Sequence, residues 1–84
     1  MDYVARTPEQ LSQILKACRK RRDLTQQEAA RKVGLKQATI SAIENNASST
    51  SVDTLYKLLS ALGVELVVRE ATATRASTAA SREW

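Results

Sequence analysis

The side chains that could do chemistry in this 84-residue chain are mainly amides, hydroxyls and the basic groups of lysine and arginine. The sequence contains no histidine, so a catalytic relay built on histidine is excluded, and no hydroxyl group has an evident base or metal site beside it. We therefore expect no enzyme, no metal or cofactor, and no small-molecule substrate. Amides and basic groups suit recognition instead, because they form directed hydrogen bonds with base edges and phosphates.

The candidates for such recognition lie at the start of a helix that we predict over residues 37–45. With about 100° between successive residues, Ile40 and Ile43 define its inward face and Ser41 lies on the far side. A recognition helix enters the major groove of DNA with its N-terminal part. We therefore predict base contacts from Lys36, Gln37, Ala38, Thr39 and Ser41. Gln37 can pair with N6 and N7 of adenine, and Lys36 can reach either a guanine or a phosphate.

The elements that must position these side chains have the spacing of a helix-turn-helix. If Gln26 is position one, Ala30 is at position five, where only a small side chain lets the two helices touch. Gly34 is at position nine, where the tight turn favours a residue that tolerates positive φ. The inward apolar positions around them are filled by Ala29, Val33, Leu35, Ile40 and Ile43. A helical hairpin that binds nothing is the alternative, but this spacing and the basic surroundings favour DNA recognition.

Three further helices are predicted from caps and apolar spacing. Thr7 and Pro8 begin a helix that ends near Arg21 or Arg22 and carries an apolar stripe: Leu11, Ile14, Leu15 and Cys18. Thr25 and Glu28 form a capping box that opens a helix ending at Gly34, and Ser51 caps a last helix ending at Gly63. The expected fold class is therefore all-α, a four- to five-helix repressor-like domain.

Residues 64–69 read as one short β-strand with Val64, Leu66 and Val68 on one face. A single strand leaves its backbone hydrogen-bonding groups without partners. The economical partner is the same strand of a second copy across a twofold axis, and Tyr3-Val4 is a short competing partner within the chain. We therefore expect a homodimer that places two recognition helices in successive major grooves, about 34 Å apart.

Charge narrows the class of partner without deciding it. The chain has 13 Lys and Arg residues against 9 Asp and Glu residues. Between Lys16 and Lys36 there are eight basic residues, opposed only by Asp23 and Glu28. Candidate phosphate contacts are Thr25, which is primarily a cap, and Arg31, Lys32, Asn45 and Asn46. For the basic run 19–22 and for Arg31 and Lys32, a solvated helix face remains the alternative, as does simple capping for Asn45 and Asn46.

Size and composition point to one small cytoplasmic domain. Residues 1–70 are expected to form the DNA-binding and dimerisation domain. The lone Cys18 is expected to be a buried apolar residue, which suits a reducing compartment. The longest apolar stretch, residues 62–68, is interrupted by Glu65, so no membrane span is expected, and the N-terminus lacks the regions of a signal peptide.

Residues 71–84 differ in composition from the rest of the chain. They contain no Leu, Ile or Val, so we expect a flexible tail. The tail ends in Trp84, the only tryptophan of the chain. Trp84 is either an aromatic residue on a disordered end or an anchor that enters a pocket on a partner.

The motif resembles the phage-repressor/Cro-like (XRE) helix-turn-helix family. The resemblance rests on residues 24–30, 33–35, 39–41 and 43–45, and it covers about residues 11–68. Residues 36–41, the Glu44-Asn45-Asn46 ending and the terminal Glu83-Trp84 look like HipB-type antitoxins in particular.

The resemblance implies a dimeric repressor that binds its own operator, acts in the nucleoid, and holds a HipA-like kinase toxin inactive. In phage-repressor-like proteins, glutamines at the spacing of Gln26 and Gln37 sit side by side, and the first touches phosphate and braces the second. The resemblance also favours Trp84 as an anchor on the toxin. The alternatives are an autonomous repressor without a toxin partner and a protein-interaction module that does not meet DNA.

Overall fold

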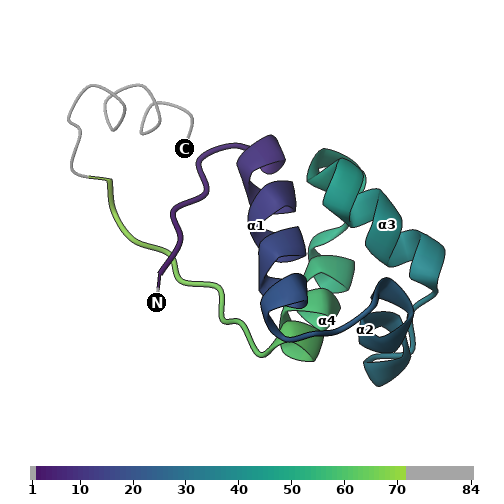
Figure 1. Cartoon of the computed structure of the whole chain (residues 1–84). Coiled ribbons are helices and arrows are strands. Elements are labelled where there is room, and N and C mark those ends of the chain that lie inside the picture. The colour runs from purple at the N-terminus through teal and green to yellow at the C-terminus, as the bar shows by residue number, and fades with distance from the viewer. Residues whose placement is uncertain (1, 72–84) are drawn as a thin grey trace.

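The structure is a computed structural model that describes residues 2–71. Within these residues the chain forms four α-helices and one short 3₁₀ helix, and no strand (Figure 1). The elements are α1 (Pro8–Arg21), α2 (Gln26–Lys32), α3 (Gln37–Asn45), η1 (Ala47–Ser49) and α4 (Val52–Leu62). The helical fold predicted from the sequence is confirmed, whereas the tail from residue 72 and its Trp84 lie outside the described residues.

Three of the four α-helices, α1, α2 and α4, begin at a residue whose side chain caps them. The hydroxyl groups of Thr7 and Ser51 accept hydrogen bonds from the backbone N–H groups of Gln10 and Thr54, at 3.1 Å in both cases. At its other end, α4 stops at Gly63, whose φ of 67° lies in the left-handed region. These local signals set where the helices begin and end.

The turn between α2 and α3 is the part of the fold that sets the recognition helix at its angle. Gly34 has a φ of 71°, which confirms that this position needs a residue tolerant of the left-handed region. Ala30 is buried against α3, and its carbonyl oxygen accepts a hydrogen bond from the N–H of Leu35 at 2.9 Å. The small side chain and the glycine therefore have the roles that the motif predicts.

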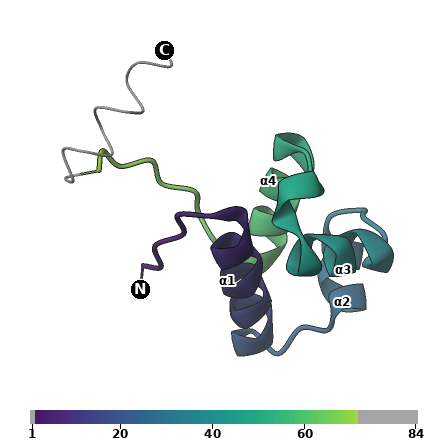
Figure 2. The same ribbon diagram turned by 90° about the horizontal axis from the view of Figure 1, so that it is seen from above.

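The core lies between α1, α3 and α4, with α2 closing one end (Figure 2). Its largest fully buried side chains are Leu15, Ile40, Ile43, Leu58 and Leu62. Cys18 is buried among them, as predicted for an apolar role. No helix in residues 2–71 is long and apolar enough to cross a membrane.

Residues 64–71 leave α4 as an extended segment without strand hydrogen bonds. The competing prediction of a strand pair with Tyr3-Val4 is wrong for the single chain, because neither segment forms a strand. The strand predicted at residues 64–69 does not form in the single chain, because no segment pairs with it, and Val68 is 91% exposed. In Figures 1 and 2 this segment lies on the far side of α1 from α2 and α3.

Candidate nucleic-acid interface

The predicted base-contacting residues lie on the outer side of α3 and at its start. Lys36 is the N-cap residue of α3 and, together with Gln37 and Ala38, it is exposed. Thr39 and Ser41 are half-buried. Opposite them, Ile40 and Ile43 enter the core, so the helix has the inward and outward faces that the sequence predicts. The first turn of α3 is thus available to a groove of DNA.

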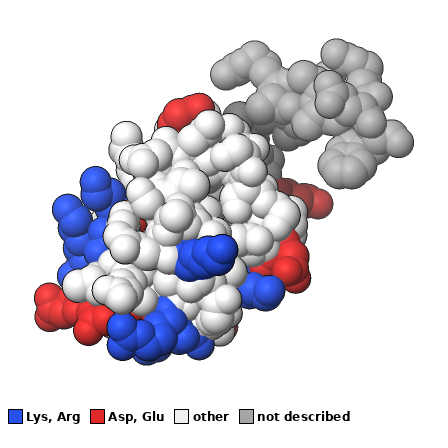
Figure 3. All heavy atoms as spheres, turned by 90° about the vertical axis from the view of Figure 1, so that its right-hand side faces the viewer, with Lys and Arg blue, Asp and Glu red and all other residues white. Residues whose placement is uncertain are grey.

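Figure 3 shows the side of the molecule on which α2 and α3 lie. In this view basic side chains lie at the left, along the lower side and in the middle of the face, and acidic side chains lie at the top, the lower left and the right. Arg31 and Lys32, in the last turn of α2, are exposed and line a shallow hollow with Leu24 and Glu28. The basic side chains on this face can contact phosphates, and the uncharged surface between them can meet base edges.

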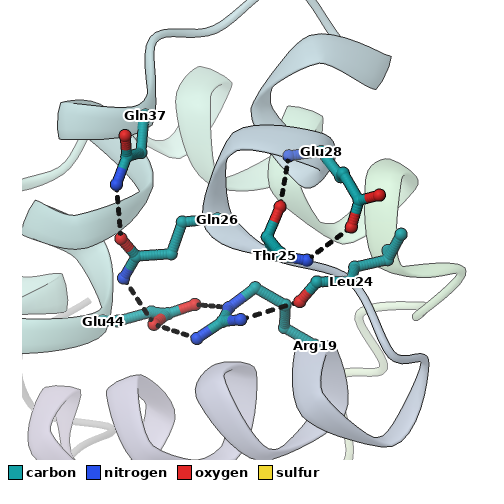
Figure 4. Close-up of polar contacts among 7 residues, drawn as sticks. All are labelled: Arg19, Leu24, Thr25, Gln26, Glu28, Gln37 and Glu44. Carbon is teal, nitrogen blue, oxygen red and sulfur yellow. Dashed lines mark hydrogen bonds and ion pairs between the residues drawn. The ribbon is translucent and has the colours of Figure 1, made fainter.

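A chain of hydrogen bonds runs from the surface of α3 into the core (Figure 4). Nε2 of Gln37 donates to Oε1 of Gln26 at 3.2 Å. Nε2 of Gln26 donates to Oε1 of Glu44 at 3.1 Å. Arg19 then donates to both carboxylate oxygens of Glu44, from Nε at 2.6 Å and from Nη2 at 3.1 Å. The two glutamines therefore lie side by side, as the resemblance implied, and the inner one is held by a buried ion pair.

The ion pair joins α1 to α3 inside the protein. The residues Arg19 and Glu44 are each 8% exposed. Nη1 of Arg19 also donates to the carbonyl oxygen of Leu24 at 2.7 Å, so the guanidinium group fixes the loop before α2 as well. Burying the two charges costs solvation, which this bidentate geometry and the added hydrogen bonds offset.

The Glu44 carboxyl group is held in its charged form by its neighbours. Burial raises the pKa of this group. Hydrogen bonds from Arg19 and Gln26 and the positive charges of Arg19 and Lys16 lower the pKa, and their combined effect is larger than that of burial. The pKa therefore lies below the ordinary value of 4.5. Glu44 is thus an ionised acceptor, with no proton to donate.

Arg19 and Glu44 are the residues that the sequence reasoning missed. The basic run 19–22 was interpreted as either a solvated face or a phosphate-binding surface, and for Arg19 both interpretations are wrong. A signal was present, because Glu44 lies four residues after Ile40 and one after Ile43, on the inward side of α3. An inward carboxylate needs a cationic partner, and Arg19 is placed next to Cys18 on the buried stripe of α1.

The other polar candidates have structural partners. Thr25 completes the predicted capping box: its hydroxyl group accepts from the N–H of Glu28 at 3.0 Å, and its own N–H donates to the Glu28 carboxylate at 2.8 Å. These bonds lower the pKa of Glu28. Asn46 caps η1 by accepting from the N–H of Ser48 at 3.2 Å, which favours the capping role among its alternatives, while Asn45 is exposed. Residues 2–71 contain no cluster of three or more metal-ligating side chains.

The chain is similar to known proteins in its sequence and in its fold. The helix-turn-helix family matches residues 15–68 of the chain. Antitoxin HipB of Escherichia coli O6:H1 is 42% identical over 65 residues, which cover 77% of this chain and 69% of that protein. Antitoxin HipB of Escherichia coli K12 is 40% identical over 65 residues, covering 77% and 74%.

A solved structure has the same fold. It is described as a HipA-HipB-O2-O3 complex and is 35% identical in sequence, with a TM-score of 0.79 over 86% of this chain and 100% of that one. Its described assembly contains HipA, a protein partner, beside HipB.

Proposed function

The chain belongs to the XRE-type helix-turn-helix family that includes the HipB antitoxins, and on this premise we propose that it is a DNA-binding repressor and antitoxin. In this proposal it binds palindromic operators as a dimer, represses its own operon in the nucleoid, and holds a HipA-like kinase toxin inactive. The observation that carries the DNA-binding part is the braced pair of Gln26 and Gln37 at the exposed start of α3. A glutamine fixed there can read a base edge, as a freely rotating one cannot.

Most of the proposed contacts come from exposed side chains, whereas Gln26, Thr39 and Ser41 are half-buried. Base contacts come from the first turns of α3: Lys36, Gln37, Ala38, Thr39 and Ser41. Arg31 and Lys32 supply charge for phosphates, and Gln26 donates to a phosphate with the Nε2 hydrogen that Glu44 does not take. Thr25, Asn45 and Asn46 are exposed and are proposed as further phosphate contacts, with Asn46 also capping η1.

The dimer is proposed to form through the segment that leaves α4. Pairing residues 64–69 with the same segment of a second copy would give its backbone groups their partners and cover Val64, Leu66 and Val68. This segment lies on the far side of α1 from α3, so pairing leaves the recognition helix accessible (Figure 1).

The toxin partner is proposed from the family. A related HipB is described in a complex with HipA. We propose that residues 71–84 form a separate tail and that Trp84 anchors it on the toxin. Deleting this tail should weaken binding to a HipA-like kinase and leave DNA binding intact. If the deletion changes neither, the toxin contact lies elsewhere or the protein is an autonomous repressor.

Selection from a random duplex library at about physiological salt tests the DNA-binding part, because non-specific phosphate binding is already weak there. Recovery of a palindrome with half-sites one or more helical turns apart would support the proposal. Absence of any enriched sequence would contradict it and favour a protein-interaction module.

A further inference from the structure

Four side chains form the chain of hydrogen bonds in Figure 4, and they differ in the hydrogen bonds that they can donate and accept. They are Gln37, Gln26, Glu44 and Arg19. The guanidinium group of Arg19 only donates hydrogen bonds, and the ionised carboxylate of Glu44 only accepts them. An amide does both, with its oxygen accepting and its nitrogen donating. A glutamine beside a carboxylate must therefore point its nitrogen toward it.

This constraint passes from one amide to the next. Gln26 gives its Nε2 to Glu44, so its Oε1 faces Gln37. Gln37 must then give a hydrogen of its own Nε2 to that oxygen. The Oε1 of Gln37 and the second hydrogen on its Nε2 are left for a ligand, and the residue is exposed. The buried charge pair thus decides which way the surface amide is turned.

We propose that the buried Arg19–Glu44 ion pair is a specificity-determining element: it fixes the polarity of the Gln37 amide and so makes this position select adenine over guanine. The inference rests on the proposed function, since it deepens how the same site reads DNA. Neither residue touches DNA in this proposal, so both are positioning residues.

The choice of adenine follows from the groups that each base shows in the major groove. Adenine presents an acceptor at N7 and a donor at N6, which match one N–H and one oxygen of Gln37. Guanine presents acceptors at both N7 and O6, so the outward oxygen of Gln37 would face another oxygen. A bidentate contact of this kind discriminates against the wrong base by roughly tenfold to a hundredfold.

The decisive variant is Glu44→Gln, which keeps the shape and allows the polarity to reverse. The oxygen of a glutamine at this position takes the place of Oε2 and accepts from Nε of Arg19, and its nitrogen takes the place of Oε1 and donates to Gln26, at the loss of the hydrogen bond from Nη2 of Arg19. Gln26 then turns its nitrogen toward Gln37, and Gln37 presents both N–H groups to the DNA. Selection from a random duplex library should show adenine at one position of each half-site for the wild type. For the variant, the ratio of adenine to guanine there should fall by about tenfold or more.

Glu9→Gln is the matched control, because Glu9 is an exposed residue of α1 and the substitution removes the same charge. It should keep the wild-type preference for adenine. Thermal unfolding of each variant shows whether it is folded. If Glu44→Gln does not fold, Gln26→Met is the variant that tests the proposal. It removes the hydrogen-bond partner of Gln37 and leaves the Arg19–Glu44 ion pair intact. It should bring the preference between adenine and guanine close to even.

The outcomes separate the two proposals. A wild-type protein that selects no sequence contradicts the proposed function, and the inference falls with it. A wild type that selects a palindrome without adenine facing Gln37 overturns the inference alone. An unchanged ratio of adenine to guanine in folded Glu44→Gln, or in Gln26→Met where that variant decides, also overturns it.

Discussion

Ser12 of α1 donates a hydrogen bond from its buried hydroxyl group to the carbonyl oxygen of Ile43 in α3, over 2.9 Å. The same hydroxyl oxygen accepts a hydrogen bond from the N–H of Ala47 at 2.8 Å. Ser12 is only 3% exposed, so no bulk water can replace it. One hydroxyl group thus satisfies two backbone groups at the point where the recognition helix ends and η1 begins.

Replacing Ser12 with alanine should therefore destabilise the protein by about 1–3 kcal/mol, because a buried carbonyl and a buried N–H lose their partner. Urea unfolding measures this as a lower midpoint with an unchanged slope. Ser60→Ala is the control, because Ser60 is exposed on α4 and should change stability by less than about 0.5 kcal/mol. Equal stability of the two variants would contradict the structural role of Ser12.

The Arg19–Glu44 pair should make stability depend on pH in the acid range. The pKa of Glu44 is lowered in the folded protein, so the unfolded chain takes up this proton first as the pH falls. The stabilisation is present above the ordinary value of 4.5 and is lost as the pH falls through the folded pKa. Urea unfolding between about pH 7 and about pH 3 should show this loss.

The double variant Arg19→Met with Glu44→Leu is the comparison for this pH dependence, because it removes both buried charges together. It should lose less stability toward low pH than the wild type. Glu28→Gln checks the second carboxyl group whose pKa is lowered, and it should keep the part of the pH dependence that belongs to Glu44. A double variant with the full wild-type loss would show that the pair does not contribute.

The fold was predictable because its signals are local. Caps at Thr7, Thr25 and Ser51 and the glycines at the ends of α2 and α4 fix the helix boundaries within a few residues of each position. The buried polar contacts were not predictable in this way. Ser12 and Arg19 meet their partners across 31 and 25 residues, so a pattern within one helix cannot identify them.

The surface of the site was predictable in type, but its internal support was not. The resemblance to phage-repressor-like proteins implied that the amides of Gln26 and Gln37 lie side by side, and the structure shows them hydrogen-bonded. Gln26 is held by the carboxylate of Glu44 on α3, which is paired with the guanidinium group of Arg19 on α1. These contacts depend on how the helices pack. The strand predicted at residues 64–69 does not form in the single chain, and its proposed partner belongs to a second copy.

Gln37 and Lys32 should contribute to DNA binding in different ways. Gln37→Ala should relax the preference at one base position of each half-site by roughly tenfold or more, because a base-edge contact is lost. Lys32→Ala should weaken binding to all sequences alike and reduce the slope of log affinity against log salt by about 1 per phosphate contact. Competition binding with duplexes changed at single positions, repeated at several salt concentrations, measures both effects. A uniform loss for Gln37→Ala would assign it to phosphate contact.

Val68 tests the proposed dimer, because it is 91% exposed in the single chain and lies on the face of residues 64–69 that we propose a second copy covers. Val68→Asp should place a charge in the paired segment, split the dimer, and weaken operator binding by about 100-fold or more, since two half-sites would no longer be held together. Val67→Asp is the matched control: Val67 is 74% exposed and points to the opposite face of an extended segment. It should keep the dimer. Light scattering and binding to the selected palindrome are measured on both variants. Dimers of undiminished stability for Val68→Asp would place the interface elsewhere on the protein.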